Sequence, residues 1–314
     1  MSDDESDDGG EGAKRQRIEG PAEGSENDAS SEEQETPEMQ MREESGGNFI
    51  MVETIDETFS RWSGEEGSLR GQFAAACGVG KTLTQISIAK LAFDLEYVDT
   101  VAIFAPNLNL IGQHTEEWDM YMGADKFEKL VVCSEIGDKF GISVTTSADE
   151  IFKFLIKRPA PSEPRRLRVI FCTYQSARRL GEAQKKARTD DEEDKVKIGL
   201  AHLDEAHRTT GPIGDGPMSM SSVLFDDIVE IMTRLSWTAT PRHIKPRIKP
   251  RRDGKPVASM DDPELYGDVW KSISFRGAVE LGCILPYKAR RAHTGPAGPT
   301  RATQGHRPQP QPQP

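Results

Sequence analysis

The sequence has few cysteines, no long apolar run and, after its first 46 residues, no net charge. Its 314 residues include four cysteines, which lie far apart and form no Cys-x-x-Cys pair. Such spacing is typical of reduced thiols and argues against a disulfide framework or a zinc site. No stretch approaches the ~20 apolar residues that span a membrane, and the acidic N-terminus lacks the apolar core of a secretory leader. We therefore expect a soluble intracellular protein that has no membrane partner.

The net charge of −12 comes entirely from the first 46 residues. This segment holds sixteen acidic and four basic residues, many Ser and Gly, and almost no large apolar side chains. A composition of this kind cannot bury enough surface to offset the entropy lost when the chain is ordered. We therefore predict a disordered acidic arm at residues 1–46. Within it, AKRQR (13–17) is open to two interpretations, a basic nuclear-import signal or plain spacer.

Between residues 47 and 288, short apolar stretches alternate with stretches of helical pattern. Apolar strands separated by helices are typical of a mostly parallel sheet that is covered on both faces. We therefore predict one α/β domain over residues 47–288. The predicted strands are 71–76, 100–105, 129–134, 168–174, 198–204 and 233–239, and the predicted helices include 81–97, 109–118 and 147–157.

The stretch AACGVGKT (75–82) carries the first chemical signal. It lies between a predicted strand and a predicted helix, so the N–H groups of its small residues can face a phosphate at a helix N-terminus. Lys81 would then reach the β- and γ-phosphates of a nucleotide, and Thr82 would offer its hydroxyl to Mg²⁺. The alternative is a chance Gly-Lys-Thr in a loop. The residues expected to hold ATP are Ala75, Ala76, Cys77, Gly78, Val79, Gly80, Lys81 and Thr82.

Two further stretches directly follow predicted strands. In LDEAHRTTG (203–211), Asp204 can hold the Mg²⁺ shell and Glu205 can polarise a water, if this strand lies beside the strand of the phosphate loop. The alternative is a solvated or helix-capping acidic pair. His202 is expected to be a core histidine with a satisfied hydrogen bond, not a ligand. TATPR (238–242) is open to a functional role or to hydroxyls that only cap a turn.

Together, the three stretches resemble superfamily 2 helicases and translocases of the DEAH-like type, which include restriction-type enzymes and predicted viral and algal helicases. Gly80-Lys81-Thr82 is similar to motif I, Asp204-Glu205-Ala206-His207 spells motif II, and Thr238-Ala239-Thr240 is similar to motif III. FAPNLNLIGQHTEEW (104–118) resembles motif Ia, CTYQS (172–176) the segment after it, and 266–288 the stretch that closes the first motor domain. The resemblance implies a single RecA-like P-loop domain.

Carried over residue by residue, the resemblance implies a site for ATP and Mg²⁺. Thr82 and Asp204 would hold the metal, and Glu205 would orient the attacking water. His207, Thr238 and Thr240 would couple the state of the nucleotide to a partner domain. Tyr174 is also open to a role as a core aromatic. Nucleic acid, with DNA favoured over RNA, would contact Pro106, Asn107, Gln113, Thr173, Tyr174 and Gln175.

The resemblance also implies a second RecA-like domain, whose arginines would stabilise charge at the γ-phosphate. The residues after Lys288 are rich in Pro, Gly, Arg and Gln, so we predict a disordered low-complexity tail at 289–314. We therefore expect a chain that stops before the second domain. Two functions stay open: the ATP-hydrolysing motor domain of a helicase or translocase, or an ATP- and nucleic-acid-binding module without hydrolysis or unwinding of its own.

A basic stretch, PRHIKPRIKPRRDGKP (241–256), holds seven bases, one acid and four prolines. The prolines exclude a helix, so we predict an exposed loop. It is either a solvated surface loop or a sequence-independent contact to a phosphate backbone.

Overall fold

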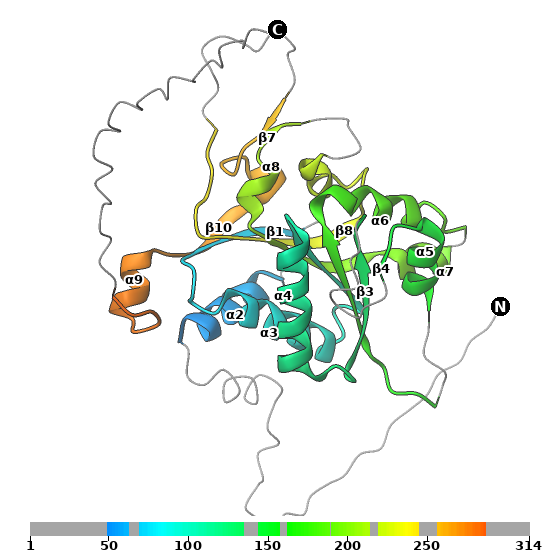
Figure 1. The fold of residues 1–314 in the computed structure, drawn as a ribbon, viewed down its shortest axis with the longest axis horizontal. Helices are drawn as coiled ribbons and strands as arrows, with labels where there is room; N and C mark the ends of the chain where they lie inside the picture. Colours follow the sequence, from blue (N-terminus) through cyan, green and yellow to red (C-terminus); the bar gives the residue numbers. More distant parts are fainter. Residues whose placement is uncertain are drawn as a thin grey trace, which may run out of the picture. The chain divides into compact units, whose positions relative to one another are not determined.

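One parallel sheet forms the centre of the structure, a computed structural model that describes residues 49–62, 69–134, 144–157, 162–188, 190–213, 219–244 and 256–286 (Figure 1). Its eight strands lie in the order β10-β1-β8-β6-β2-β5-β3-β4, and each neighbouring pair is parallel. The predicted α/β fold with a mostly parallel sheet is therefore confirmed. The strands are β1 (Leu69–Ala75), β2 (Thr100–Ala105), β3 (Phe127–Val132), β4 (Val144–Thr145), β5 (Leu167–Thr173), β6 (Ile198–Asp204), β8 (Ile231–Thr238) and β10 (Asp268–Ile273).

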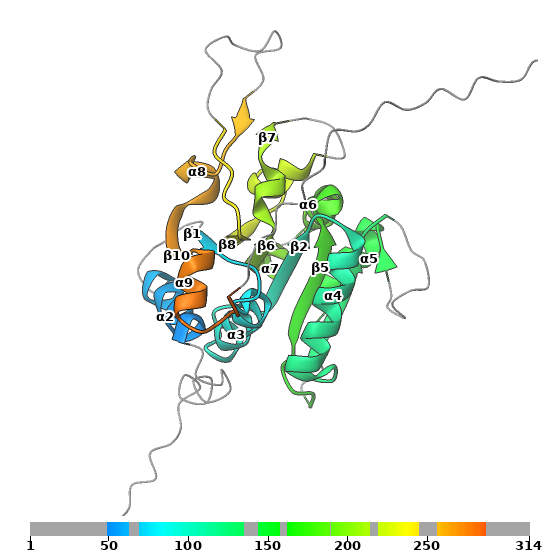
Figure 2. The ribbon, with the colours of Figure 1, turned by 60° about the vertical axis from the view of Figure 1, so that its left-hand side comes forward.

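The helices lie on both faces of this sheet (Figure 2). One face carries α2 (Phe49–Trp62), α3 (Lys81–Asp94) and α4 (Leu108–Trp118), and the other carries α5 (Ala148–Ile156), α6 (Ala177–Gln184) and α7 (Asp190–Val196). Each face has its own apolar core, so the central strands are covered twice. Every residue of β2 and β6 is buried, which explains why the sequences of these strands are mostly apolar and do not alternate with polar residues.

Two predicted helices begin where their capping residues place them. The Asn107 side chain accepts a hydrogen bond from the N–H of Leu110 at 3.0 Å, at the start of α4. The Ser147 hydroxyl accepts one from the N–H of Glu150 at 3.4 Å, at the start of α5. Both caps satisfy N–H groups that the first helical turn leaves without a partner.

The strand order contains one correction. We expected β6, which ends in Asp204, to lie beside β1, which leads into the phosphate loop. β8 lies between them instead, because it pairs with β1 through Ala74–Thr238 and with β6 through Asp204–Trp237. β8 is buried along most of its length, so it suits the middle of the sheet. At ~4.8 Å per strand, Asp204 therefore lies about 10 Å from the line of β1.

The end of the described chain returns to the phosphate loop. After the antiparallel pair of β7 (Gly211–Pro212) and β9 (Val257–Ala258) and the short α8 (Pro263–Tyr266), strand β10 adds to the free side of β1. Helix α9 (Phe275–Glu280) follows, and its Ala278 packs with Ile273 against Ala75, Ala76 and Val79. Residues near the end of the described chain therefore pack against the phosphate loop.

Several predictions concern residues outside the described ranges. They are the acidic arm at 1–46, the import signal at 13–17, the tail at 289–314 and most of the basic loop. The domain limits at 47 and 288 also stay predictions. Within the described ranges, no helix combines the length and apolar character needed to cross a membrane.

Candidate functional site

The phosphate loop, residues 75–82, joins β1 to α3 at the carboxyl edge of the sheet. Gly78 and Gly80 have φ angles of 85° and 90°, in a region that residues with a Cβ rarely adopt. Gly80 caps α3 and brings no side chain to hydrogen bond with the first turn. The first N–H groups of α3 therefore stay available for an anion, which the helix dipole also favours.

The side chains of the loop fit a nucleotide phosphate. Lys81 is half-buried, and its Nζ donates to the carbonyl oxygens of Ala75 at 3.2 Å and Ala76 at 3.4 Å. Its ammonium group therefore lies over the loop. Thr82 is half-buried in the first turn of α3. Within the loop, the side chain of Val79 is buried and that of Cys77 is exposed. A cation, a hydroxyl and free N–H groups are thus combined in one turn.

Asp204, at the end of β6, is held at two points. Its carboxylate Oδ2 lies 3.1 Å from Nε2 of His114, and its carbonyl oxygen accepts a hydrogen bond from the Tyr174 hydroxyl at 2.7 Å. The next residue, Glu205, has a φ of 51°. For a non-glycine residue this conformation costs of order 1–3 kcal/mol and persists where the surrounding structure imposes it. The backbone therefore turns at Glu205, away from the direction of β6.

His207 links the turn after β6 to the end of β8. Its Nδ1 lies 3.2 Å from Oε2 of Glu205 and 2.9 Å from the Thr238 hydroxyl. The Thr238 hydroxyl also accepts a hydrogen bond from the N–H of Thr240 at 3.1 Å, while the Thr240 side chain is exposed. The structure therefore brings Glu205, His207 and Thr238 together, and Thr240 joins them through its backbone.

His202 is a core residue, as predicted. It is fully buried, and its Nδ1 accepts a hydrogen bond from Nε1 of Trp237 at 3.0 Å. Its Nε2 has no hydrogen-bond partner among the described residues, so the hydrogen bonding that we expected is satisfied at one ring nitrogen only. Burial, helped by the nearby His114 ring, lowers the pKa of His202 to about 3. The ring is therefore neutral at physiological pH.

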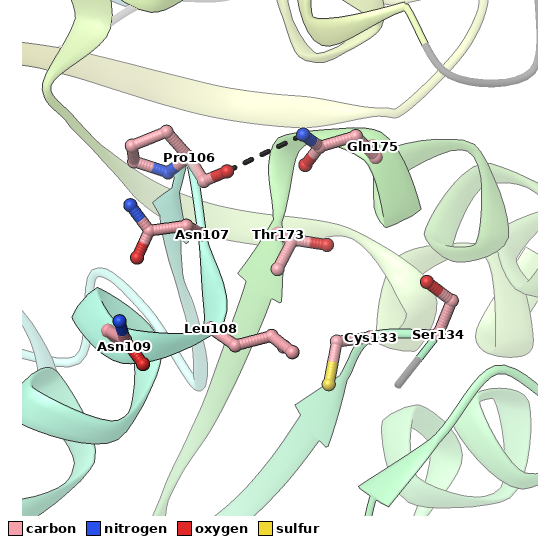
Figure 3. A pocket seen from close by; sticks show the side chains of 8 residues that line it. All are labelled: Pro106, Asn107, Leu108, Asn109, Cys133, Ser134, Thr173 and Gln175. Carbon is pink, nitrogen blue, oxygen red and sulfur yellow. Dashed lines mark hydrogen bonds between the residues drawn. The ribbon is translucent and has the colours of Figure 1, made fainter. Parts of the chain in front are cut away.

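A hollow of about 410 Å³ opens at the carboxyl ends of β2, β3 and β5 (Figure 3). The amide of Gln175 donates to the Pro106 carbonyl at 3.4 Å and so joins two of its walls. The Thr173 hydroxyl donates to that of Ser176 at 3.0 Å. Among the residues that the structure describes, those that line it carry no charge: Pro106, Asn107, Leu108, Asn109, Cys133, Ser134, Thr173 and Gln175.

The structure divides the residues predicted to contact nucleic acid. Pro106, Asn107, Thr173 and Gln175 line the hollow. Gln113 lies outside it, exposed on α4, and donates to Glu117 at 2.8 Å. Tyr174 is fully buried, so the structure places its side chain in the core, the second of the two roles left open for it.

The family model of the type III restriction enzyme res subunit (ResIII) matches residues 38–243. The chain belongs to the ResIII family. No curated protein matches the sequence. Among solved structures, this ResIII chain is similar to a nuclease-deletion mutant of the type ISP restriction-modification enzyme LlaGI in complex with a DNA substrate mimic. The identity is 25% and the TM-score 0.56, and the match covers 74% of this chain and 20% of the other.

The ResIII chain is also similar to the ATP-dependent type ISP restriction-modification enzyme LlaBIII bound to DNA. The identity is 26% and the TM-score 0.58, over 73% of this chain and 15% of that enzyme. It therefore spans a fifth or less of the length of both enzymes. The resemblance to the first RecA-like domain of superfamily 2 helicases is confirmed.

Sequence reasoning missed several residues of the ResIII site. Leu108 and Asn109 line the hollow and lie in the stretch 104–118 that resembles motif Ia, but they were not predicted as site residues. Cys133 and Ser134 also line it, and nothing in their local sequence marks them. His114 did leave a signal. It is a polar residue spaced with Ile111 and Trp118 on the buried side of α4, where an apolar side chain is the default.

Proposed function

We propose that the chain is the ATP-binding motor domain of a superfamily 2 helicase or translocase, in which ATP hydrolysis is coupled to nucleic-acid remodelling. The observation that carries the proposal is the position of His207, whose Nδ1 lies within hydrogen-bond reach of both Glu205 and Thr238. Motifs that are weak signals separately in the sequence meet here, at the edge of the sheet that also holds the phosphate loop.

Each residue has a definite task in this proposal. The N–H groups of the loop and Lys81 bind the phosphates, while Thr82 and Asp204 hold Mg²⁺. Glu205 accepts a hydrogen bond from the attacking water and orients it. ATP supplies the phosphoryl group that is transferred, and Mg²⁺ neutralises charge on it. His207 and Thr238 transmit a shift of Glu205 to β8.

The hollow is the proposed contact for the nucleic-acid backbone. Amides and hydroxyls, such as those of Asn107, Thr173 and Gln175, can donate to phosphate oxygens without reading the base sequence. LlaGI and LlaBIII were solved with DNA or a DNA mimic, which supports DNA as the partner. Because the described residues of the lining carry no charge, the contribution of these residues to binding should vary little with salt.

The proposal is tested by ATP turnover of the purified 314-residue chain with and without DNA or RNA, beside its affinity for a fluorescent ATP analogue. We expect Lys81→Ala to weaken Mg²⁺-nucleotide binding at least 100-fold, because the loop loses its cation. Turnover that nucleic acid stimulates and Lys81→Ala abolishes would support the motor. Binding that needs Lys81, with no turnover in any condition, would support the alternative, an ATP- and nucleic-acid-binding module. A chain that binds no nucleotide would contradict both.

Cys77 offers an independent test of the phosphate site. It is exposed in the loop, whereas Cys133 and Cys172 are buried, and burial raises the pKa of the Cys172 thiol well above its usual value. A mild alkylating reagent should therefore modify Cys77 long before Cys133 or Cys172. Saturating Mg²⁺-ATP should slow the modification of Cys77 at least fivefold, as measured by mass spectrometry of the peptides. The same rate with and without Mg²⁺-ATP, or protection that persists in Lys81→Ala, would argue against phosphate binding by this loop.

A further inference from the structure

His114 is a buried histidine that the proposed function leaves without a task. It lies on α4, two turns after the helix begins at the hollow, and is 2% exposed. Its Nε2 is 3.1 Å from Oδ2 of Asp204. An ionised carboxylate only accepts hydrogen bonds, so the ring donates from Nε2.

The hydrogen bond to Asp204 satisfies one of the two ring nitrogens of His114. The other ring nitrogen, Nδ1, is buried and has no hydrogen-bond partner among the described residues. Leaving a buried polar atom unpaired costs about 1–3 kcal/mol, which an apolar side chain would avoid. His202 also has one buried ring nitrogen without a partner among the described residues, so what distinguishes His114 is that its other nitrogen contacts Asp204, a residue of the proposed site.

The contact also fixes how Asp204 presents its carboxylate. The hydrogen bond between His114 and Oδ2 restricts rotation of the Asp204 side chain, while Tyr174 holds the backbone carbonyl of the same residue. Oδ1 is then the oxygen left for a metal ion. Carboxylates that hold metals are commonly fixed by such outer hydrogen bonds, and removal of the outer partner costs 10- to 100-fold in metal affinity.

We propose that His114 is a positioning residue that orients the carboxylate of Asp204 toward Mg²⁺. This inference rests on the proposed function, because it assigns His114 to the metal side of the same nucleotide site. It adds a residue from α4 to a site otherwise built from the phosphate loop and the ends of β6 and β8.

Three variants of the full chain test the inference. His114→Leu removes the donor, while His114→Gln keeps an N–H donor with a similar reach. Thr115→Val is the matched control: Thr115 is the next residue on α4, is 1% exposed, and donates only to the Ile111 carbonyl of its own helix, at 2.8 Å. The readout is the Mg²⁺ concentration that gives half-maximal binding of a fluorescent ATP analogue, with circular dichroism to show that each variant is folded.

We expect His114→Leu to raise the half-saturating Mg²⁺ concentration about tenfold or more. His114→Gln should stay within about threefold of the unchanged chain and Thr115→Val within about twofold. Binding of the analogue in excess EDTA, which depends on Lys81 and not on Mg²⁺, should not change. These readouts separate metal positioning from a general loosening of α4.

Two results would overturn the role of His114 alone. One is Lys81-dependent binding whose Mg²⁺ requirement is the same in His114→Leu. The other is an equal loss in Thr115→Val or in His114→Gln. If His114→Leu does not fold, His114→Gln decides by itself, and a tenfold or larger loss in this folded variant contradicts the inference. If the chain without any substitution binds no Mg²⁺-nucleotide, the proposed function itself is overturned.

Discussion

Replacement of Gly181 by alanine is expected to lower the free energy of unfolding by about 3 kcal/mol, at the upper end of what overpacking usually costs. Gly181 lies in α6, where a Cβ would come within 1.7 Å of the backbone carbonyl oxygen of Ile228. That carbonyl cannot turn away easily, because the N–H groups of Ile228 and Val229 both donate to the Phe225 carbonyl. The helix would have to move off the segment that leads into β8.

The sign of this effect makes the test sharp. In an open helix, Gly to Ala stabilises by ~1 kcal/mol, since Gly is the poorer helix former. Gly277 in α9 is the matched control: a Cβ there would meet only Ser274 Oγ, at an ordinary 3.4 Å. Gly277→Ala should therefore be neutral or slightly stabilising. Denaturant unfolding followed by circular dichroism compares the two, and a Gly181→Ala chain as stable as the original would contradict the packing of α6 on this segment.

Replacement of Glu205 by glutamine is expected to lower ATP turnover by about 10²–10⁴-fold, the range typical for loss of a general base. Glutamine has nearly the same shape, so the left-handed backbone at this position and the place of the side chain beside His207 should be kept. What is lost is the negative charge that would orient the water. The affinity for Mg²⁺-nucleotide should stay within about threefold.

Asp204→Asn is the comparison that separates the two carboxylates. It should weaken Mg²⁺-dependent nucleotide binding, whereas Glu205→Gln should spare binding and remove turnover. Steady-state turnover and analogue titration on the same preparations give both quantities. Glu205→Gln with undiminished turnover, or with the binding defect expected of Asp204→Asn, would show that the roles are assigned wrongly.

The strands of this fold could be predicted where they are buried on both faces, and not where they lie at an edge. β2 and β6 are buried throughout and mostly apolar, and their limits match the prediction residue for residue. β10 was not predicted as a strand, since only Trp270 and Ile273 of its six residues are buried. The order of the strands in the sheet could not be predicted from local sequence patterns either. The insertion of β8 between β1 and β6 depends on pairings between distant parts of the chain.

The site shows the same division. Asp204 lies at the end of a strand that local sequence identifies, and Lys81 and His207 follow such strands within six residues, so the strands bring all three to one edge. Their partners come from elsewhere. His114 reaches Asp204 from 90 residues earlier in the chain, and Tyr174 from 30 residues earlier. A sequence shows that a polar residue occupies an apolar helix face, but it does not show which carboxylate that residue meets.

The pairing of β1 has a consequence for how the protein is made. Both of its neighbours come from late in the chain: Gly71 pairs with Leu235 on one side and with Asp268 on the other. At a synthesis rate of ~5–20 residues per second, β1 leaves the ribosome roughly ten to thirty seconds before its first neighbour does. During that interval the phosphate loop has no sheet to hold it. The capacity to bind nucleotide should therefore appear abruptly, and only after β8 has been synthesised, as a mark that β1 has joined the sheet.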